Sequence, residues 1–221
     1  SSKFLTEVIE EIIPYKSISI LSGPSFSNEV SQSLPTAVTL ATKDKKDFEN
    51  ISKLIPNKEF RIYYSNDLIG TQIGGALKNI YAIAAGIAEG LNLGENAKSA
   101  LISRSFAEMT RYAKKFKADK NTLFGLSGLG DLILTCSSKN SRNTQFGIKL
   151  ASSKYDNFLD LLKSQEVTEG YYTVKAVYNI SQKKNIDMPI MESVYNILYK
   201  QHDLKEELSN LLSRPITEEK I

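Results

Sequence analysis

The sequence has little of what a disulfide, a metal site or a membrane span requires. Its 221 residues include one cysteine, one histidine and no tryptophan. A lone cysteine, Cys136, cannot form an internal disulfide, which is typical of a reducing compartment. One cysteine and one histidine are too few for a structural zinc site, so we expect no metal. The longest nearly uncharged apolar run, Ile80 to Ala88, is much shorter than the roughly 20 residues that span a bilayer.

The sequence also has no large excess of positive or negative charge. The chain has 28 lysines and arginines against 25 acidic residues, a net charge of +3, and no long basic run. A nucleic-acid partner is therefore not favoured, whereas a small positive excess suits an anionic metabolite. The amino end, residues 1–13, is acidic and amphipathic and lacks the basic start and cleavage site of a secretory signal. We expect a cytoplasmic protein with no nucleic-acid partner and no membrane insertion.

The hydrophobic periodicity changes at about residue 66. Before this point the pattern predicts strands at 17–21, 36–42 and 60–65, and helices at 1–13, 27–34 and 44–55. Beyond it we find only helical patterns, over 67–91, 95–117, 120–124, 130–137, 142–152, 156–163, 168–184, 188–197 and 203–213. The sequence therefore predicts an α/β segment followed by an all-helical domain, mostly α overall, with domains at 1–66 and 67–221.

A glycine-rich nucleotide loop is missing from the α/β segment. No G-x-G-x-x-G follows a predicted strand, and the nearest sequence, GLSGLG at 125–130, has its glycines in reverse spacing. Three short strands alone would also make a thin and marginal sheet. Either this domain is small and unusual, or the chain is the carboxyl part of something longer.

One lysine interrupts a helix of apolar and small residues. In GGALKNIYAIAAGIAEG, residues 74–90, a stripe of small side chains surrounds Lys78 at helical spacing: Thr71, Gly74, Gly75, Ala82, Ala85 and Gly86. Each glycine inside a helix costs roughly 0.5–1 kcal/mol relative to alanine, so we expect the glycines to clear space for a close neighbour. Two interpretations remain open. Either a helix packs on this stripe and Lys78 reaches water, or the lysine faces a bound ligand.

A second unusual stretch, SSKNSRNTQFG at 137–147, indicates an anion site. Ser141 is a good N-cap, and Arg142 and Asn143 fall in the first helical turn. Free backbone N–H groups and the helix dipole favour negative charge at such a position, and the arginine adds a planar fork that matches phosphate. The alternative is an ordinary surface helix start with a solvated arginine.

Two further turns carry candidate residues. In GLGD, residues 128–131, a tight glycine turn leads into a short helix that Asp131 opens, with Thr135 one turn later on the same face. The carboxylate either caps this helix or orients a nearby ammonium group. In GPSFSNEV, residues 23–30, Gly23 and Ser25 lie at a strand-to-helix turn, where open α/β sheets bind ligands.

Taken together, these motifs resemble the bacterial NAD(P)-dependent glycerol-3-phosphate dehydrogenases. The similarity runs in order through SGPSF, PTA, GGALKNIYAIAAGIAEGL, RSFAEMTR, GLSGLGDLILTCSSKNSRN and EVTEGYYT, and it covers nearly the whole chain. In that family a Rossmann-like dinucleotide-binding domain precedes an all-helical substrate domain. The resemblance implies the interconversion of dihydroxyacetone phosphate and sn-glycerol 3-phosphate with NAD or NADP, which feeds phospholipid synthesis, and it leaves a homodimer open.

The resemblance also implies roles for individual residues. Lys78 becomes the catalytic acid/base, with Asp131 and Thr135 as the other catalytic residues. Substrate-binding residues would be Gly23, Ser25, Lys78, Asp131, Ser141, Arg142 and Asn143, and cofactor-binding residues would be Ser27, Arg142, Val167 and Glu169. No metal ligand is implied.

Two features of that family are absent from this sequence: the glycine-rich nucleotide loop, and a lysine that precedes the first residue of this chain. Residues 1–66 resemble the last strands and helices of the dinucleotide-binding domain, so we expect a truncated chain that binds cofactor poorly. Two rivals remain open. One is a related helical-domain dehydrogenase acting on a hydroxy acid or sugar acid. The other, for the fragment alone, is a non-catalytic phosphometabolite-binding or oligomerisation module.

Overall fold

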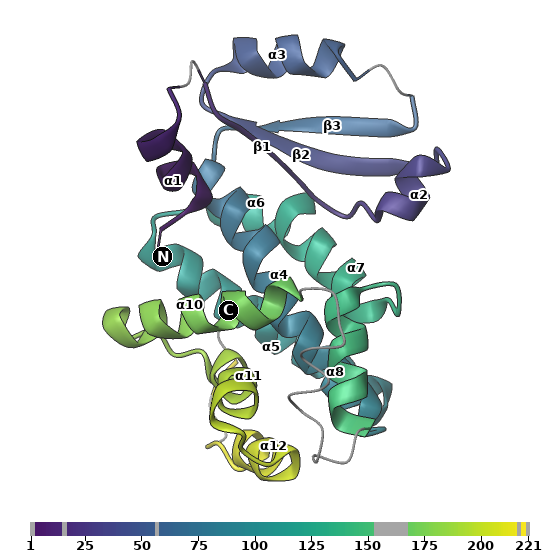
Figure 1. The fold of residues 1–221 in the computed structure, drawn as a ribbon, viewed down its shortest axis with the longest axis vertical. Helices are drawn as coiled ribbons and strands as arrows, with labels where there is room; N and C mark the ends of the chain where they lie inside the picture. Colours follow the sequence, from purple (N-terminus) through teal and green to yellow (C-terminus); the bar gives the residue numbers. More distant parts are fainter. Residues whose placement is uncertain (1–2, 15–16, 56–57, 153–167, 216–217, 220–221) are drawn as a thin grey trace. The chain divides into compact units, whose positions relative to one another are not determined.

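The computed structural model describes residues 3–14, 17–55, 58–152, 168–215 and 218–219 (Figure 1). A small sheet and a series of helices follow each other in the predicted order, which confirms the predicted fold class. The helix predicted at 156–163 and the candidate cofactor residue Val167 lie outside the described residues. Within the described ranges, no helix combines the length and the apolar character that crossing a membrane would require.

The sheet has three strands in the order β1-β2-β3. β1 (Ser19–Ser22) pairs antiparallel with β2 (Thr36–Thr42), and β2 pairs in parallel with β3 (Phe60–Ser65). The last two strands have the predicted bounds, because their β-branched and aromatic runs are ended by polar turn residues. The remaining elements of this part are the helices α1 (Leu5–Ile12), α2 (Ser27–Ser31) and α3 (Lys45–Lys53), the last connecting the parallel pair.

The two faces of the sheet are distinguished by the register of β2 and β3. Leu40 lies opposite Tyr64, and Tyr64 makes an edge-to-face contact with Phe48 of α3, with ring centroids 5.3 Å apart. Opposed residues share a face and successive residues alternate, so Thr39 and Tyr63 belong to the other face. α3 therefore covers the Leu40 face of the sheet.

The helical part begins with two long helices and continues with shorter ones. The long pair is α4 (Leu68–Gly90) and α5 (Gly94–Lys115). The others are α6 (Lys120–Phe124), α7 (Asp131–Ser137), α8 (Arg142–Ser152), α10 (Glu169–Lys184), α11 (Pro189–Lys200) and α12 (Leu204–Leu212). These bounds agree with the predicted helical patterns to within a few residues at most ends, as expected from the apolar spacing.

A π-helix, η1 (Leu126–Gly130), replaces part of the tight glycine turn that the sequence predicts before Asp131. Its defining hydrogen bond spans five residues, from the Gly130 N–H to the Gly125 carbonyl oxygen at 3.1 Å. Single π-turns of this kind often occur at functional sites. The Gly-rich sequence fits this backbone because Gly128 lies so close to Leu123 that a Cβ would overlap the Leu123 carbonyl group.

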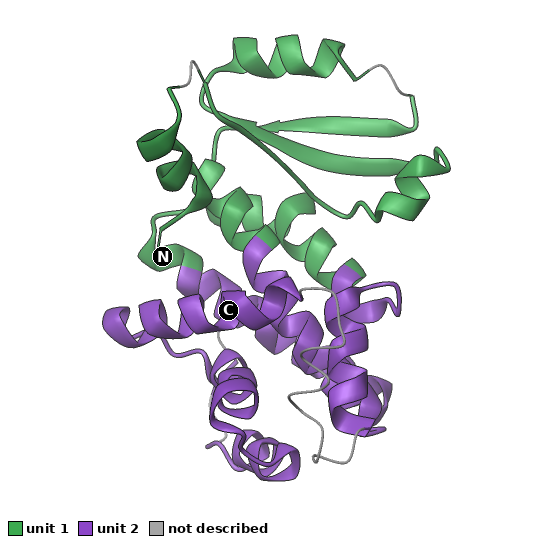
Figure 2. Ribbon diagram, in the orientation of Figure 1, with its two compact units in different colours: residues 1–75, 113–134 green, residues 76–112, 135–221 purple. Residues whose placement is uncertain are grey.

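The chain divides into two compact units, coloured separately in Figure 2. Unit 1 comprises Ser1–Gly75 and Ala113–Leu134 and contains the sheet, and unit 2 comprises Ala76–Tyr112 and Thr135–Ile221. The described part of unit 2 is helical. The helix α4 begins in unit 1 and ends in unit 2, so the domain boundary at residue 66 stays a prediction from composition.

Unit 2 is organised around the carboxyl-terminal part of α4 and a buried carboxylate on α5. The Glu108 side chain is almost completely buried and accepts hydrogen bonds from the N–H groups of Ile190 (2.6 Å) and Met191 (3.1 Å). The Tyr81 hydroxyl of α4 donates to the same carboxylate at 3.3 Å. Glu108 thus satisfies the first free N–H groups of α11 and links three helices.

Candidate active site

Two glycines in the stripe of small residues on α4 lie against neighbouring backbone. A Cβ added at Gly74 would overlap the Ser127 carbonyl oxygen of η1 within unit 1. A Cβ added at Gly86 would overlap the Thr144 carbonyl oxygen of α8 within unit 2. The prediction that the glycines clear space for close neighbours is therefore confirmed for Gly74 and Gly86, whereas Gly75 has only the Ser22 hydroxyl nearby, at 3.1 Å. Lys78 lies on α4 between these two contacts and is half-buried.

The start of α8 is built as the sequence predicts. The Thr144 N–H donates to the Ser141 hydroxyl oxygen at 3.3 Å, which confirms Ser141 as the N-cap. The Thr144 hydroxyl donates to the Thr135 carbonyl oxygen at 2.8 Å and ties this helix to α7. The cap is buried, whereas the side chain of Arg142 is 59% exposed. An accessible guanidinium therefore stands in the first turn of a firmly held helix.

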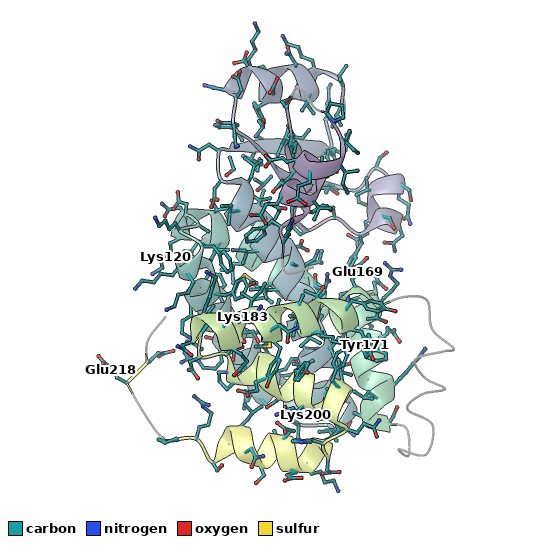
Figure 3. All side chains as sticks on the ribbon, turned by 60° about the vertical axis from the view of Figure 1, so that its left-hand side comes forward. Lys120, Glu169, Tyr171, Lys183, Lys200 and Glu218 are labelled. Atoms are coloured by element: carbon teal, nitrogen blue, oxygen red, sulfur yellow. The ribbon has the colours of Figure 1, made fainter. Side chains whose placement is uncertain are left out.

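A hydrogen-bond network joins the starts of α8 and α10 to α4. The Asn143 side-chain amide donates to Asn79 Oδ1 at 3.1 Å, and Asn143 Oδ1 accepts from the Gly170 N–H at 3.0 Å. Asn79 Nδ2 donates to Glu169 Oε2 at 3.4 Å, and Glu169 Oε1 accepts from Arg142 at 3.1 Å. Glu169 lies in the first turn of α10 (Figure 3). Three predicted site residues, Arg142, Asn143 and Glu169, are thus brought together.

Sequence reasoning missed two members of this network, Asn79 and Gly170. A signal for Asn79 was present, because an asparagine inside an apolar helix must find hydrogen-bond partners when it is buried. A Cβ at Gly170 would lie 2.6 Å from the Asn79 carbonyl oxygen, so only glycine allows this approach. The partners come from helices far apart in the sequence, and periodicity does not reveal which helices meet.

Two candidate residues of unit 1, Gly23 and Ser25, lie in a turn next to the end of η1. Gly23 has φ +146° and lies so close to Val38 that a Cβ would be 3.0 Å from the Val38 Cα. The Ser25 hydroxyl donates to the Gly23 carbonyl oxygen at 3.0 Å. The ring of Pro24, between them, lies next to Gly130, the residue before Asp131, with 3.8 Å to a Cβ built there. The turn at 23–25 and the start of α7 are therefore neighbours.

The remaining predicted residues of unit 1 differ in exposure. Asp131 heads α7 and is only 2% exposed, which is unusual for a carboxylate that merely caps a helix. Ser27 begins α2 and is exposed. The roles of these residues in binding or catalysis stay predictions.

The chemical groups at the start of α8 are suited to anion recognition. A guanidinium, carboxamides, a hydroxyl and a helix amino terminus are donors that bind phosphate. In the described part of the chain, no three His, Cys, Asp or Glu side chains are arranged to hold a metal ion.

The chain is similar to glycerol-3-phosphate dehydrogenases along most of its length. The family profile for the NAD-dependent glycerol-3-phosphate dehydrogenase C-terminus matches residues 67–209, and the profile for the N-terminus matches residues 1–48. A glycerol-3-phosphate dehydrogenase [NAD(P)+] of Francisella tularensis subsp. tularensis strain SCHU S4 is 43% identical over 220 residues. That alignment covers 99% of this chain but 66% of the relative, so the chain spans slightly less than two thirds of its length.

Solved structures give the same result. The crystal structure of glycerol-3-phosphate dehydrogenase from Coxiella burnetii matches with a TM-score of 0.91 and 37% identity, covering 96% of this chain and 65% of that chain. The glycerol-3-phosphate dehydrogenase of Plasmodium falciparum matches with a TM-score of 0.86 and 27% identity, covering 98% and 62%. Profile, sequence and structure agree, and the chain belongs to the NAD-dependent glycerol-3-phosphate dehydrogenase family.

Proposed function

We propose that this chain is part of an oxidoreductase that interconverts dihydroxyacetone phosphate and sn-glycerol 3-phosphate with a nicotinamide dinucleotide. The observation that carries the proposal is the start of α8. There the exposed Arg142 follows the buried cap Ser141, and its neighbour Asn143 is hydrogen-bonded to the residue after Lys78. In this proposal the phosphate-binding group and the proton donor precede Asn143 and Asn79 in the chain, and these two residues form a hydrogen bond between α8 and α4.

Phosphate recognition follows from the first turn of α8. Its leading N–H groups have no partner inside the helix, and the helix dipole adds a partial positive charge. The guanidinium of Arg142 presents two parallel N–H donors, which match two phosphate oxygens. In this proposal Ser141, Arg142 and Asn143 hold the phosphate, with Gly23 and Ser25 as further substrate contacts by family resemblance.

The residues at the start of α10 fit a nicotinamide dinucleotide. Glu169 carries an accessible carboxylate that can accept hydrogen bonds from ribose hydroxyls or a carboxamide, and Arg142 beside it can pair with an anionic group. Ser27 and Val167 complete the cofactor contacts that the family resemblance implies. When bound, the cofactor supplies the hydride that reduces the ketone carbon.

Lys78 is the proposed general acid. As the ketone is reduced, its oxygen gains negative charge, which an ammonium group stabilises before it donates the proton. The half-buried position of Lys78 on a helix of small residues supports this role, because partial exclusion of water strengthens such an interaction. Asp131 and Thr135 receive their catalytic roles from the family resemblance. The cytoplasmic location and a homodimer also stay predictions.

The proposal is tested by steady-state turnover of the full-length protein with dihydroxyacetone phosphate and with dihydroxyacetone. We expect turnover of the phosphorylated ketone, and an Arg142→Ala variant whose KM for that ketone rises about 10- to 100-fold. Arg214→Ala is the matched control, because Arg214 makes an ion pair with Asp187 at the same 3.1 Å distance. An unchanged KM in Arg142→Ala would mean that the phosphate binds elsewhere. Preference for an unphosphorylated hydroxy acid would favour the rival dehydrogenase class.

A further inference from the structure

We propose that Asn79 is a positioning residue, whose carboxamide fixes the orientations of Asn143 and Glu169 and through them holds the guanidinium of Arg142. The grip of Arg142 on a phosphorylated ligand would then depend on a side chain that acts only through other residues. This inference rests on the proposed function, because it takes Arg142 as the phosphate-binding group.

The orientation of each side-chain amide in the network can be deduced from the Gly170 N–H, which can act only as a donor. The Gly170 N–H can only donate, so the atom of Asn143 that faces it must be Oδ1. Asn143 Nδ2 then donates, and the atom of Asn79 that receives this bond must be Oδ1. Nδ2 of Asn79 is left to face Glu169, whose carboxylate can only accept. These three hydrogen bonds are therefore compatible with one orientation of each amide.

Burial keeps the amides of Asn79 and Asn143 in this arrangement. Asn79 is 8% exposed and Asn143 is 5% exposed, so neither amide can exchange a lost partner freely for water. The network also closes on itself, because Gly170 follows Glu169 and Asn143 follows Arg142 in the chain. Moving one amide therefore disturbs the starts of both α8 and α10.

The consequence for Arg142 lies in the carboxylate of Glu169. An exposed ion pair between two long side chains contributes little by itself, because both chains lose rotamer freedom. Here Asn79 holds Oε2, so that Oε1 stays in place for Arg142 at 3.1 Å. The hydrogen bond with Asn79 thus orders the Glu169 carboxylate independently of Arg142. Removal of Asn79 should release Glu169 and let the guanidinium sample other rotamers.

The sharpest variant is Asn79→Ala, with Asn79→Gln as the conservative variant that keeps the carboxamide. A matched control is Asn196→Ala, since Asn196 also donates to a glutamate, Glu207 Oε1, at 3.1 Å within the same unit. Three quantities are measured in the full-length protein: the hydrogen-exchange protection of the Gly170 amide, and the KM and the kcat for both dihydroxyacetone phosphate and dihydroxyacetone.

We expect Asn79→Ala to lose protection at the Gly170 amide and to raise the KM for the phosphorylated ketone about tenfold, with kcat and the unphosphorylated ketone much less affected. Asn79→Gln should recover part of the effect, and Asn196→Ala should show none. Retained protection of Gly170, or an equal change for both ketones, would overturn the inference and leave the proposed function standing. If the wild-type protein turns over no phosphorylated ketone, the proposed function fails and this inference falls with it.

Discussion

At the scale of single residues, the buried Glu108 couples stability to pH. Burial raises the pKa of its carboxyl group to about 7, against the opposing effect of the Ile190 and Met191 N–H groups and Arg111. The folded state therefore binds a proton more tightly than the unfolded state does. The contribution of this group to stability is fully present below its ordinary pKa of 4.5 and is lost as the pH rises through about 7.

The variant Glu108→Gln should remove this dependence. Between about pH 5 and pH 7 the free energy of unfolding of the wild-type protein should contain a declining contribution of at most about 3 kcal/mol, which the neutral glutamine lacks. Urea unfolding at several pH values measures the difference between the two proteins. Glu89→Gln is the control, because a hydrogen bond from Lys98 lowers the pKa of Glu89 and moves its effect below this window. Parallel pH profiles for wild type and Glu108→Gln would contradict the assignment.

At the scale of elements, the packing of α4 against α8 depends on direct contact between their backbones. Gly86 lies against the Thr144 carbonyl group, and Gly147 on the opposite helix lies against Ile83 in the same way. Neither neighbour is a flexible side chain that can rotate away. The distance between these helices is therefore set by the absence of two β-carbons, and the start of α8, which carries Arg142, depends on it.

Gly86→Ala should consequently destabilise the fold by about 1–3 kcal/mol or more, because an added methyl forces the two helices apart. Gly75→Ala is the matched control on the same helix, since its one close neighbour is the Ser22 hydroxyl at 3.1 Å, which can rotate. At Gly75 the better helix propensity of alanine offsets the energetic cost of this contact. Chemical denaturation compares the two variants, and equal stability of Gly86→Ala and Gly75→Ala would refute the packing argument.

The elements whose pattern is local were predictable from the sequence. β2 and β3 follow from β-branched runs between turn residues, and the N-cap Ser141 follows from its place before a helical pattern. The π-helix η1 was not predicted, because its bond from Gly130 to Gly125 depends on how closely the backbone can pack there. The role of Asn79 was missed for a related reason, since its partner Asn143 lies on a different helix and helix pairing is a tertiary property.

At the scale of the whole molecule, α4 is the element that both compact units share. The chain passes from unit 1 to unit 2 between Gly75 and Ala76, and Lys78 follows within one helical turn. Lys78 lies within the residues that match the family profile, and its role is a proposal from the family resemblance. The next residue, Asn79, is hydrogen-bonded to Asn143 of α8. The proposed mechanism therefore depends more on Lys78 than on any other residue.

The most direct test is kcat for reduction of dihydroxyacetone phosphate by the full-length protein, compared between wild type and Lys78→Ala. Loss of a positioned general acid is expected to lower kcat by about 10²- to 10⁴-fold. The thermal unfolding temperature should stay close to that of wild type, because the Lys78 side chain is only half-buried. A Lys78→Ala protein that retains a wild-type kcat would contradict the proposed mechanism.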